Sequence, residues 1–394
     1  MEAHEIHKAF IDIYGQPDLL VRSPARINLI GEHTDYNGGF VLPAAINKET
    51  YFAISGNGTR TCNVYSKHFD ETVTFELDDI KPSDKSWANY LIGAVDQVQK
   101  NGYKVHGFNI VFGGNIPIGA GLSSSASVEC GLIFSINELF SLGIEPVEII
   151  KMGQKAENEF VGVQCGIMDQ FINVMGKKDH ALRLDCRSLE YYYFPLKLNN
   201  YCIILCNSLV SHSLATSAYN TRKEECLRGV EIIKAHYPEV ESLRDVKLPM
   251  LQHLLPELGE NVFNRCKFVI EENLRVLESC DQLQKGDVAG FGRNLYDSHY
   301  GLALTYKVSC PELDFLIGFT INKPQVVGAR MMGGGFGGCT INIVENTYKD
   351  DFIQAISDAY QQRFEIMPEI YEVAPAEGTS EAAVSECVNT KSSL

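Results

Sequence analysis

The sequence lacks the features that mark several large classes of protein. No stretch comes near the roughly 20 apolar residues that a membrane-spanning helix needs. The opening residues, MEAHEIHKAFIDIYGQ, carry acidic side chains and lack the basic start and apolar run of a secretory signal. Positive charge is scarce, because 34 Lys and Arg stand against 50 Asp and Glu, for a net charge of -16. We therefore expect no membrane and no nucleic acid among the partners.

Two common site signatures are also missing. None of the 12 cysteines forms a CxxC pair, and several lie within apolar runs such as YCIILCNS, which is typical of reduced, buried thiols in a cytoplasmic protein. No Gly-Lys-Ser/Thr follows a four-residue spacer, so there is no Walker A loop. Any phosphate site must work without that lysine.

The patterns that are present predict a mixed chain of two domains. A length of 394 residues exceeds what one core usually serves, and a cleft between domains is a natural ligand site. Strand patterns and turns dominate the first part, and apolar spacing predicts helices over 87–100, 147–161, 166–176, 217–237 and 262–285. The short polar segment 196–200 predicts a boundary, giving domains 1–198 and 199–394. The weakly hydrophobic tail from residue 374 is expected to be frayed.

Residues 119–127, GAGLSSSAS, place almost no side-chain bulk where the strand GFNIVF passes into a predicted helix. The helix is expected because Val128, Leu132 and Ile136 recur at helical spacing. The first N–H groups of a helix are unpaired and, together with the helix dipole, attract anions such as phosphate. The alternative for this stretch alone is an ordinary Gly/Ser turn.

Three stretches together resemble the galactokinases, members of the GHMP small-molecule kinase superfamily. They are SPARINLIGEHTDYNGGFVLPAA at 23–45, PIGAGLSSSASVE at 117–129 and GARMMGGGFGGCTINIV at 328–344. Shorter matches, WANY, CGIMDQF and SCPELD, extend the likeness over most of the chain. The resemblance implies an α+β fold of two domains, an N-terminal one like ribosomal protein S5 and an α/β C-terminal one, with the active site in the cleft between them.

The resemblance also implies a reaction. ATP would phosphorylate the anomeric hydroxyl of α-D-galactose, giving α-D-galactose 1-phosphate and ADP in the Leloir pathway, with Mg²⁺ as cofactor and a monomeric enzyme. The alternatives are a kinase for N-acetylgalactosamine or arabinose, and a non-catalytic galactose sensor that binds a regulatory protein. GEHTDYNGG shows no insertion for an N-acetyl group, and such sensors lack a Ser-Ala pair where this chain has Ser125 and Ala126.

The nucleotide site follows from the same likeness. The matching phosphate-binding residues are Gly119, Ala120, Gly121, Leu122, Ser123, Ser124 and Ser125. Ser125 and Glu157 match the magnesium-contacting pair, and magnesium suits so sparse a set because it keeps several waters. The alternatives are a helix-capping serine and a solvated carboxylate. Ser66 and Trp87 match positions near adenine, although Trp87, the only tryptophan, is equally suited to core packing.

The sugar site is expected around GEHTD. The matching substrate-binding residues are Glu32, His33, Thr34, Asp35, Gly166, Asp169 and Tyr219. Carboxylates and an imidazole on one loop satisfy sugar hydroxyls, which both donate and accept. Gly166 would allow a close backbone approach to the sugar. Tyr219 has half-buried packing as its alternative role.

Asp169 and Arg26 match the family's catalytic pair. Asp169 would orient or accept the proton of the anomeric hydroxyl, as aspartate does in many kinases. Arg26 would keep that aspartate ionised and stabilise charge on the transferring phosphoryl group. An aspartate beside a guanidinium and near a helix start is a weak base, so the orienting role is favoured. The alternative is a purely structural ion pair.

Overall fold

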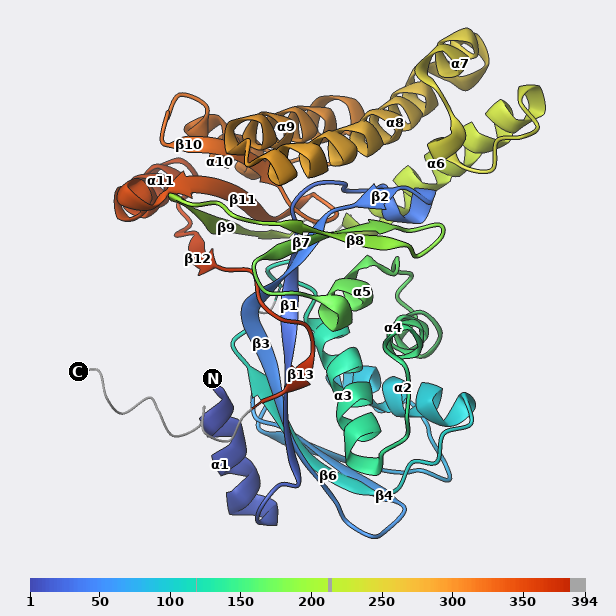
Figure 1. The fold of residues 1–394 in the computed structure, drawn as a ribbon, viewed down its shortest axis with the longest axis vertical. Coiled ribbons are helices and arrows are strands. Elements are labelled where there is room, and N and C mark those ends of the chain that lie inside the picture. Colours follow the sequence, from blue (N-terminus) through green and yellow to red (C-terminus); the bar gives the residue numbers. More distant parts are fainter. Residues whose placement is uncertain (118, 212–214, 383–394) are drawn as a thin grey trace.

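The computed structural model describes residues 1–117, 119–211 and 215–382, and its strands and helices build the mixed architecture expected from the sequence (Figure 1). The α-helices are α1 (Ala3–Tyr14), α2 (Ser86–Lys100), α3 (Ser124–Phe140), α4 (Pro146–Lys155), α5 (Met168–Met175), α6 (Ala215–His236), α7 (Leu248–His253), α8 (Leu255–Lys285), α9 (Val288–Tyr300), α10 (Pro311–Thr320) and α11 (Lys349–Phe364). Short 3₁₀ turns are η1 (Asp35–Asn37), η3 (Leu243–Asp245) and η5 (Asn346–Tyr348). Two π-helical turns, η2 (Ala156–Val161) and η4 (Gly301–Tyr306), continue α4 and α9.

The strands form three separate sheets. They are β1 (Leu19–Asn28), β2 (Phe40–Val41), β3 (Pro43–Gly56), β4 (Thr61–Ser66), β5 (Glu71–Glu76), β6 (Phe108–Gly114), β7 (His180–Asp185), β8 (Tyr191–Pro195), β9 (Tyr201–Ser211), β10 (Val326–Met331), β11 (Gly337–Glu345), β12 (Glu369–Val373) and β13 (Ser380–Glu381). Their orders are β13-β1-β3-β6-β4-β5, β10-β11-β9-β12 and β2-β7-β8. Every pairing between these strands is antiparallel except that of β4 with β6.

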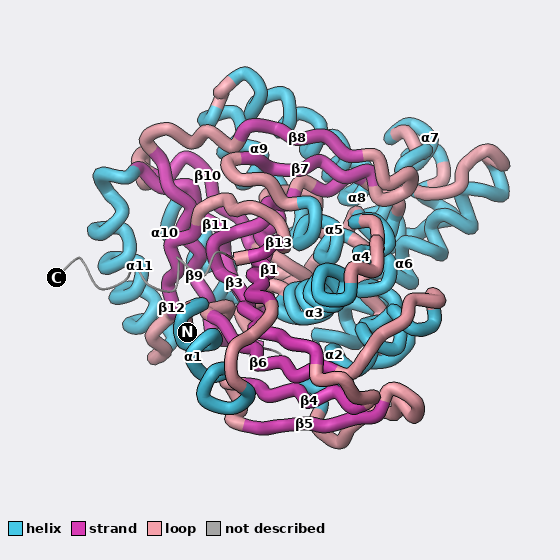
Figure 2. Tube along the Cα trace, turned by 60° about the horizontal axis from the view of Figure 1, so that its bottom comes forward, coloured by secondary structure: helices cyan, strands magenta, loops and turns pink. Residues whose placement is uncertain are grey.

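The six-stranded sheet is covered on both faces, because side chains alternate along each strand. Phe52 and Ile54 of β3 point to one face, where they pack with apolar residues of α2 and α3. Ala53 between them points to the other face and packs with Ile6 and Phe10 of α1. Helix α1 accordingly lies on the opposite side of these strands from α2 and α3 (Figure 2). The first turn of α3 is tied to both strands, because the Ser127 hydroxyl lies 2.8 Å from the Ser23 carbonyl of β1 and 2.9 Å from Thr50 Oγ1 of β3.

A second core joins the two halves of the chain. The ends of β1 and β3 contribute Ile27 and Ala44, and Leu122 of the glycine-serine loop packs into the same cluster. The four-stranded sheet contributes Ile341 and Ile343, together with side chains of α8 and α9. This shared core therefore packs the glycine-serine loop and the ends of β1 and β3 against the C-terminal half of the chain.

The expectation of a frayed tail is wrong for residues 374–382. Strand β13 pairs with β1, with Val21 opposite Glu381 and Arg22 opposite Ser380. Thr379 is buried and its hydroxyl donates to Asn173 Oδ1 at 2.7 Å. The tail thus covers the open edge of β1, where unpaired backbone groups need partners, and low hydrophobicity gives no sign of this. Residues 383–394 lie outside the described part of the chain.

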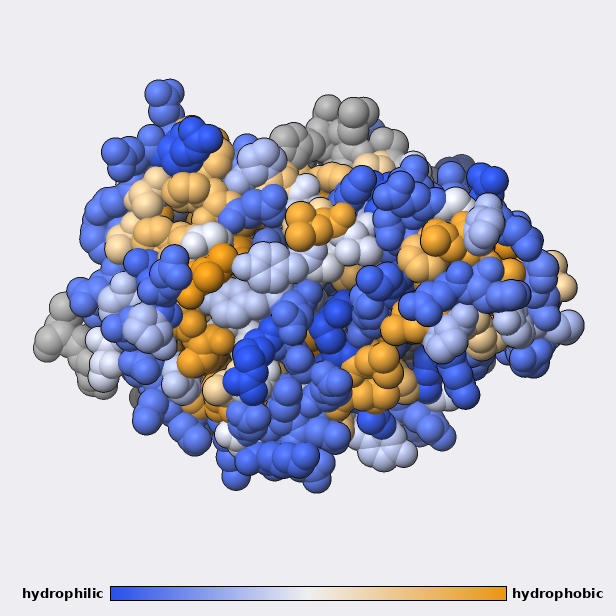
Figure 3. Space-filling view, turned by 90° about the horizontal axis from the view of Figure 1, so that it is seen from above, coloured by the Kyte–Doolittle hydropathy of each residue, from blue (hydrophilic) through white to orange (hydrophobic). Residues whose placement is uncertain are grey.

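No helix within the described ranges is both long and apolar enough to cross a bilayer. The face seen in Figure 3 carries hydrophilic side chains over most of its area, with separate hydrophobic patches between them. Scattered apolar patches of this kind are usual on proteins in water.

Candidate active site

Two cavities adjoin each other between the halves of the chain. The larger, of about 700 Å³, is bordered by the loop before α3, by the start of α2 and by Ser66. The smaller, of about 470 Å³, is bordered by the GEHTD loop, by residues 162–169 and by Tyr219. Arg26, Gly333 and Gly334 line both cavities. The arrangement therefore places two ligand-sized spaces on either side of one arginine.

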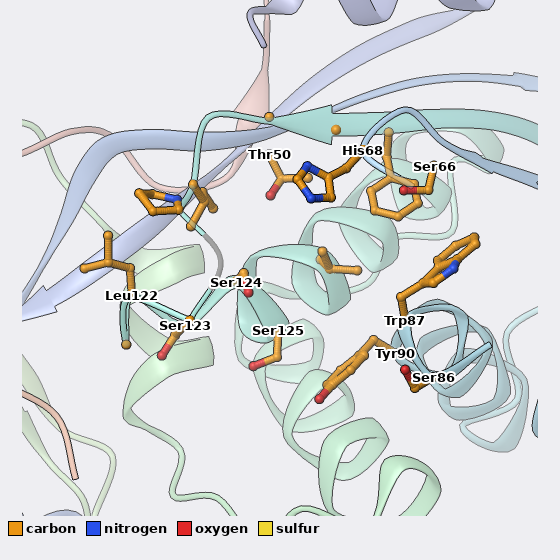
Figure 4. A pocket seen from close by; sticks show the side chains of 18 of the residues that line it. Thr50, Ser66, His68, Ser86, Trp87, Tyr90, Leu122, Ser123, Ser124 and Ser125 are labelled. Atoms are coloured by element: carbon orange, nitrogen blue, oxygen red, sulfur yellow. The ribbon is translucent and has the colours of Figure 1, made fainter. Parts of the chain in front are cut away.

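The glycine-serine loop shapes the larger cavity. Gly119 and Gly121 have φ values of +77° and +72°, which residues with a Cβ rarely adopt. Helix α3 begins at Ser124, and the serines at its start lie along the cavity wall (Figure 4). Its cap residue Ser123 has a left-handed φ of 54° and does not bond the helix N–H groups with its side chain. Those N–H groups are left for a ligand, as the helix-start interpretation expects.

Not every residue of this loop faces the cavity. Ala120 is buried and lies outside the lining, and its carbonyl accepts a hydrogen bond from Cys339 Sγ at 3.0 Å. Leu122 borders the cavity but is also buried in the shared core. The side chains of these two residues anchor the loop, so a contribution to a nucleotide would come from their backbone.

Arg26 and Asp169 form a two-pronged ion pair. Arg26 Nε donates to Asp169 Oδ1 and Nη2 donates to Oδ2, each at 2.8 Å, although the residues are 143 positions apart. The remaining Nη1 donates to the carbonyl of Gly121 at 2.6 Å, and the Ser123 hydroxyl donates to Asp169 Oδ2. Burial alone would lower the pKa of Arg26. The nearby carboxylates, Asp169 above all, have the larger combined effect and raise this pKa above its ordinary value. The pair joins the phosphate-loop cavity to the GEHTD cavity.

Asp35 and Gly166 face each other in the smaller cavity. Burial raises the pKa of Asp35 from 3.8 to about 6, with Asp169 and Glu32 adding to the rise and the Tyr36 backbone N–H opposing it. A Cβ on Gly166 would lie 2.0 Å from Asp35 Oδ2. Residue 166 therefore has to be glycine for Asp35 to keep its position. This requirement is separate from the close approach of a sugar that the sequence predicts at Gly166.

Glu32 is held from the third glycine-rich stretch. Arg330 Nη2 donates to its Oε1 at 2.5 Å, and the backbone N–H of Gly333 donates to the same oxygen at 2.8 Å. Arg330 is fully buried and lies 298 positions away. The second carboxylate oxygen of Glu32 is left for other partners at the cavity wall.

His33 and Tyr219 complete the cavity wall. Their rings are tilted at 5.3 Å between centroids, and both line the smaller cavity. Burial lowers the pKa of His33 from 6.5 to about 3, so the ring is neutral at physiological pH. Thr34, in contrast, does not line this cavity. Its hydroxyl lies 2.8 Å from the carbonyl of Gly31 and 2.6 Å from that of Phe40, where it holds the loop together.

Glu157 lies in a buried carboxylate cluster beside the start of α3. It occupies the π-helical turn η2, and π-turns are frequent at functional sites. Burial and Asp169 raise its pKa, whereas hydrogen bonds from Ser125, Cys165 and Gln170 lower it. Ser125 is therefore not the N-cap of α3. Its side chain hydrogen-bonds to Glu157, the carboxylate that the family resemblance pairs with it. Within the described residues, no group of three or more His, Cys, Asp or Glu side chains is arranged to hold a metal ion.

Ser66 and Trp87 lie at the far end of the larger cavity (Figure 4). Ser66 is fully buried, and Trp87 packs partly against the core of the six-stranded sheet. The Trp87 indole N–H donates to Glu71 Oε2 at 3.1 Å, and its ring stacks on Phe69 with 5.8 Å between centroids. Trp87 packs on the core and also borders the cavity, and its place near adenine stays a prediction.

Several residues of the site were missed from the sequence. Arg330 lies inside GARMM, where a charged residue in a buried strand beside a glycine run was the available signal. Tyr36 follows GEHTD directly, and this position was the available signal. Gln170 follows Asp169 within CGIMDQF, so its place in that stretch was the available signal. Tyr306 carries no local pattern that marks it, and its contact with Tyr36 brings it to the site.

Comparisons with known proteins agree with this geometry. A family model described as the galactokinase galactose-binding signature matches residues 8–56. Models of the GHMP kinases N terminal domain and the GHMP kinases C terminal match residues 89–177 and 279–362. A galactokinase of Clostridium tetani is 41% identical over 385 residues, covering 97% of this chain and 98% of the relative. A galactokinase of Bacillus subtilis is 40% identical over 385 residues, covering 96% and 98%.

Solved structures match as well. The crystal structure of Lactococcus lactis galactokinase complexed with galactose matches with a TM-score of 0.91 at 32% identity, covering 96% of this chain and 99% of that one. Methanococcus jannaschii mevalonate kinase matches with a TM-score of 0.66 at 17% identity and shares the fold. The expected two-domain GHMP fold is confirmed.

Proposed function

The chain belongs to the galactokinase family of the GHMP kinases and is an ATP-dependent galactokinase, and from this premise we propose how its own residues carry out the transfer. ATP would occupy the larger cavity with its phosphates at the start of α3, and galactose would occupy the smaller one. The observation that carries the proposal is the Arg26–Asp169 pair at the junction of the two cavities. A phosphoryl group passing between the substrates has to cross that junction.

Asp169 is the group proposed to manage the proton of the anomeric hydroxyl. The O1–Pγ bond forms while the bond from Pγ to the bridging oxygen of ADP breaks, and the hydroxyl proton leaves toward the carboxylate. Asp169 lies in the first turn of α5, and both of its carboxylate oxygens already accept hydrogen bonds, from Arg26 and from the Ser123 hydroxyl. Its principal role is therefore to orient the hydroxyl for in-line attack.

Arg26 is proposed to stabilise negative charge on the phosphoryl group during transfer. Two of its nitrogens hold Asp169, and the third holds the loop carbonyl of Gly121, so its guanidinium is fixed in place before substrates arrive. A preorganised cation at the junction stabilises negative charge that develops on the transferring group. The α3 dipole and the free N–H groups of the loop contribute to the same end.

Magnesium is proposed at Ser125 and Glu157. The fit is supported by buried carboxylates: burial and Asp169 raise the pKa of Glu157, burial raises the pKa of the neighbouring Glu129 well above its ordinary value, and Glu129 Oε1 has no hydrogen-bond partner among the described residues. Two oxygen ligands suit an ion that retains most of its waters. When bound, the ion would neutralise phosphate charge that a lysine neutralises in Walker A proteins.

The sugar is proposed to contact Glu32, His33, Asp35, Gly166 and Tyr219. All five line one cavity with Asp169. Thr34 is the weakest of the proposed contacts, because its hydroxyl already meets two backbone carbonyls.

The cell location, the assembly and the domain limits are also proposals. Every cysteine in the described residues is free, as expected of a protein in the reducing cytoplasm. We propose a monomer with domains 1–198 and 199–394, whose limit falls just before β9.

The test is an ADP-release assay with galactose, N-acetylgalactosamine and arabinose as acceptors. We expect kcat/KM to be highest for galactose, because residues 8–56, which supply Glu32, His33 and Asp35, match the galactose-binding signature. A preference for N-acetylgalactosamine or arabinose would refute the sugar assignment. Binding of galactose and ATP without turnover would instead indicate a sensor.

A further inference from the structure

We propose that Tyr36 and Tyr306 are positioning residues that hold His33 with its ring proton on Nε2, so that the imidazole offers a hydrogen-bond donor to a galactose oxygen. The inference rests on the proposed sugar site and adds two residues that do not line the cavity. It also assigns a direction to a hydrogen bond, which decides what kind of sugar group His33 accommodates.

The observation is a chain of hydrogen bonds running inward from His33. His33 Nδ1 lies 2.7 Å from the Tyr36 hydroxyl, which lies 2.8 Å from the Tyr306 hydroxyl. The Tyr306 hydroxyl lies 3.3 Å from Cys226 Sγ. This series of hydrogen bonds links Tyr36 to Tyr306, which are 270 positions apart in the sequence, and it ends in the protein interior.

The other ring nitrogen of His33 has no partner with hydrogen-bond geometry in the described part of the chain, although the Gly334 backbone lies close enough to raise the pKa of the ring. Nε2 is buried and, among the described residues, has no hydrogen-bond partner. A buried polar atom without a partner is rare and is a sign of function. Because the ring lines the smaller cavity, a sugar oxygen is the partner available to it.

The relative acidity of the two groups places the proton on Nε2. A phenol hydroxyl is a far stronger acid than a neutral imidazole N–H, so the bond from Tyr36 to Nδ1 is better formed with the hydroxyl donating. With Nδ1 accepting, the neutral ring has to carry its proton on Nε2.

The inner end of the chain is rigid. Tyr306 is fully buried at the end of the π-helical turn η4, where its ring packs on Phe268 with 4.7 Å between centroids. Arg222 Nε donates to the Tyr306 carbonyl at 2.9 Å. His33 itself has a φ of 63°, a conformation that few residues other than glycine adopt and that the surrounding contacts must hold. The two hydroxyls therefore meet a ring that has little freedom to turn.

A donor at this point is chemically useful. The acidic groups of the cavity, Glu32, Asp35 and Asp169, accept hydrogen bonds when ionised and cannot donate. A sugar hydroxyl that donates to one of them still has lone pairs, and burying these without a donor is unfavourable. An Nε2–H donor satisfies such an oxygen.

The experiment compares Tyr36→Phe, Tyr306→Phe and the control Tyr296→Phe in the full-length enzyme. The Tyr296 hydroxyl donates to Thr320 Oγ1 at 2.9 Å and lies outside both cavities, so the control also loses one partly buried hydroxyl. We expect Tyr36→Phe to raise the KM for galactose about tenfold, the loss of one such hydrogen bond, with the KM for ATP unchanged. Tyr306→Phe should raise it less, because Tyr36 still reaches Nδ1. The control should leave it unchanged.

Nitrogen NMR of the imidazole rings reports which nitrogen of His33 carries the proton. A tyrosine with a merely structural role would not affect this measurement. In the unaltered enzyme the His33 resonances, assigned with His33→Ala, should report a protonated Nε2 and an unprotonated Nδ1. In Tyr36→Phe the two nitrogens should move toward averaged values. A proton found on Nδ1 in the unaltered enzyme, or an unchanged galactose KM in Tyr36→Phe, would overturn the inference.

The same variants separate this inference from the proposed sugar site. If His33→Ala raises the galactose KM while Tyr36→Phe does not, the sugar site stands and the positioning role falls. If His33→Ala also leaves the galactose KM unchanged, the sugar site itself is wrong. Thermal unfolding of each variant identifies a loss of fold, and a Tyr36→Phe variant that fails to fold leaves the NMR test of the unaltered enzyme to decide.

Discussion

Replacing Asp35 by asparagine should make the enzyme more stable while weakening its hold on galactose. Asp35 is half-buried in the wall of the smaller cavity, where desolvation, Asp169 and Glu32 raise its pKa. Asparagine has nearly the same shape, keeps an oxygen to accept from the Tyr36 N–H, and carries no charge to desolvate. The substitution therefore removes an unfavourable burial that the proposed sugar site requires.

The magnitude follows from the pKa. Raising the pKa of a carboxyl from 3.8 to about 6 corresponds to about 3 kcal/mol of unfavourable free energy once the group is ionised in both states. The folded state binds the proton more tightly than the unfolded state, so the penalty is fully present above about pH 6. It shrinks as the pH falls and vanishes below the unfolded value of 3.8.

Urea unfolding of the unaltered enzyme and Asp35→Asn at pH 7.5 and pH 5 measures this difference. We expect Asp35→Asn to raise the free energy of unfolding by up to about 3 kcal/mol at pH 7.5 and about half of that at pH 5, with an unchanged m-value. The exposed Asp281 provides the control, since Asp281→Asn should change stability by less than about 0.5 kcal/mol. The reasoning is refuted if Asp35→Asn is no more stable at pH 7.5, or if its gain does not fall with pH.

Three further predictions test other parts of the site. Asp169→Asn should lower kcat by about 10²- to 10⁴-fold and leave the Kd for ATP nearly unchanged, and near-normal turnover would remove Asp169 from its role. Gly166→Ala should raise the KM for galactose about tenfold but not that for ATP, because the new Cβ would meet Asp35 Oδ2 at 2.0 Å. Trp87 is the only tryptophan and borders the larger cavity, so intrinsic fluorescence should respond to ATP and not to galactose alone, and the reverse response would exchange the two cavities.

Local patterns predicted the parts of this protein that are built from consecutive residues. Helix α3 and the glycine-serine loop before it are expected from apolar spacing and from residues without bulk, and both are found. Gly119 and Gly121 are needed for their backbone conformation alone, which is a local property. The family resemblance added the pairing of Arg26 with Asp169, which no spacing in the sequence suggests.

Tertiary structure decided which side chains meet. Thr34 stands among three residues that line the cavity, yet its hydroxyl turns to the backbone of Gly31 and Phe40, and consecutive letters do not show which way each side chain points. The tail after residue 374 was expected to be frayed because it is polar, but the edge of β1 supplies partners that only the fold provides. The links from Glu32 to Arg330 and from Tyr36 to Tyr306 span 298 and 270 positions. The sequence by itself determined the backbone of the phosphate loop, because local conformation depends on nearby residues. The buried partners of the sugar site depend on packing between distant segments, and only the tertiary structure decided them.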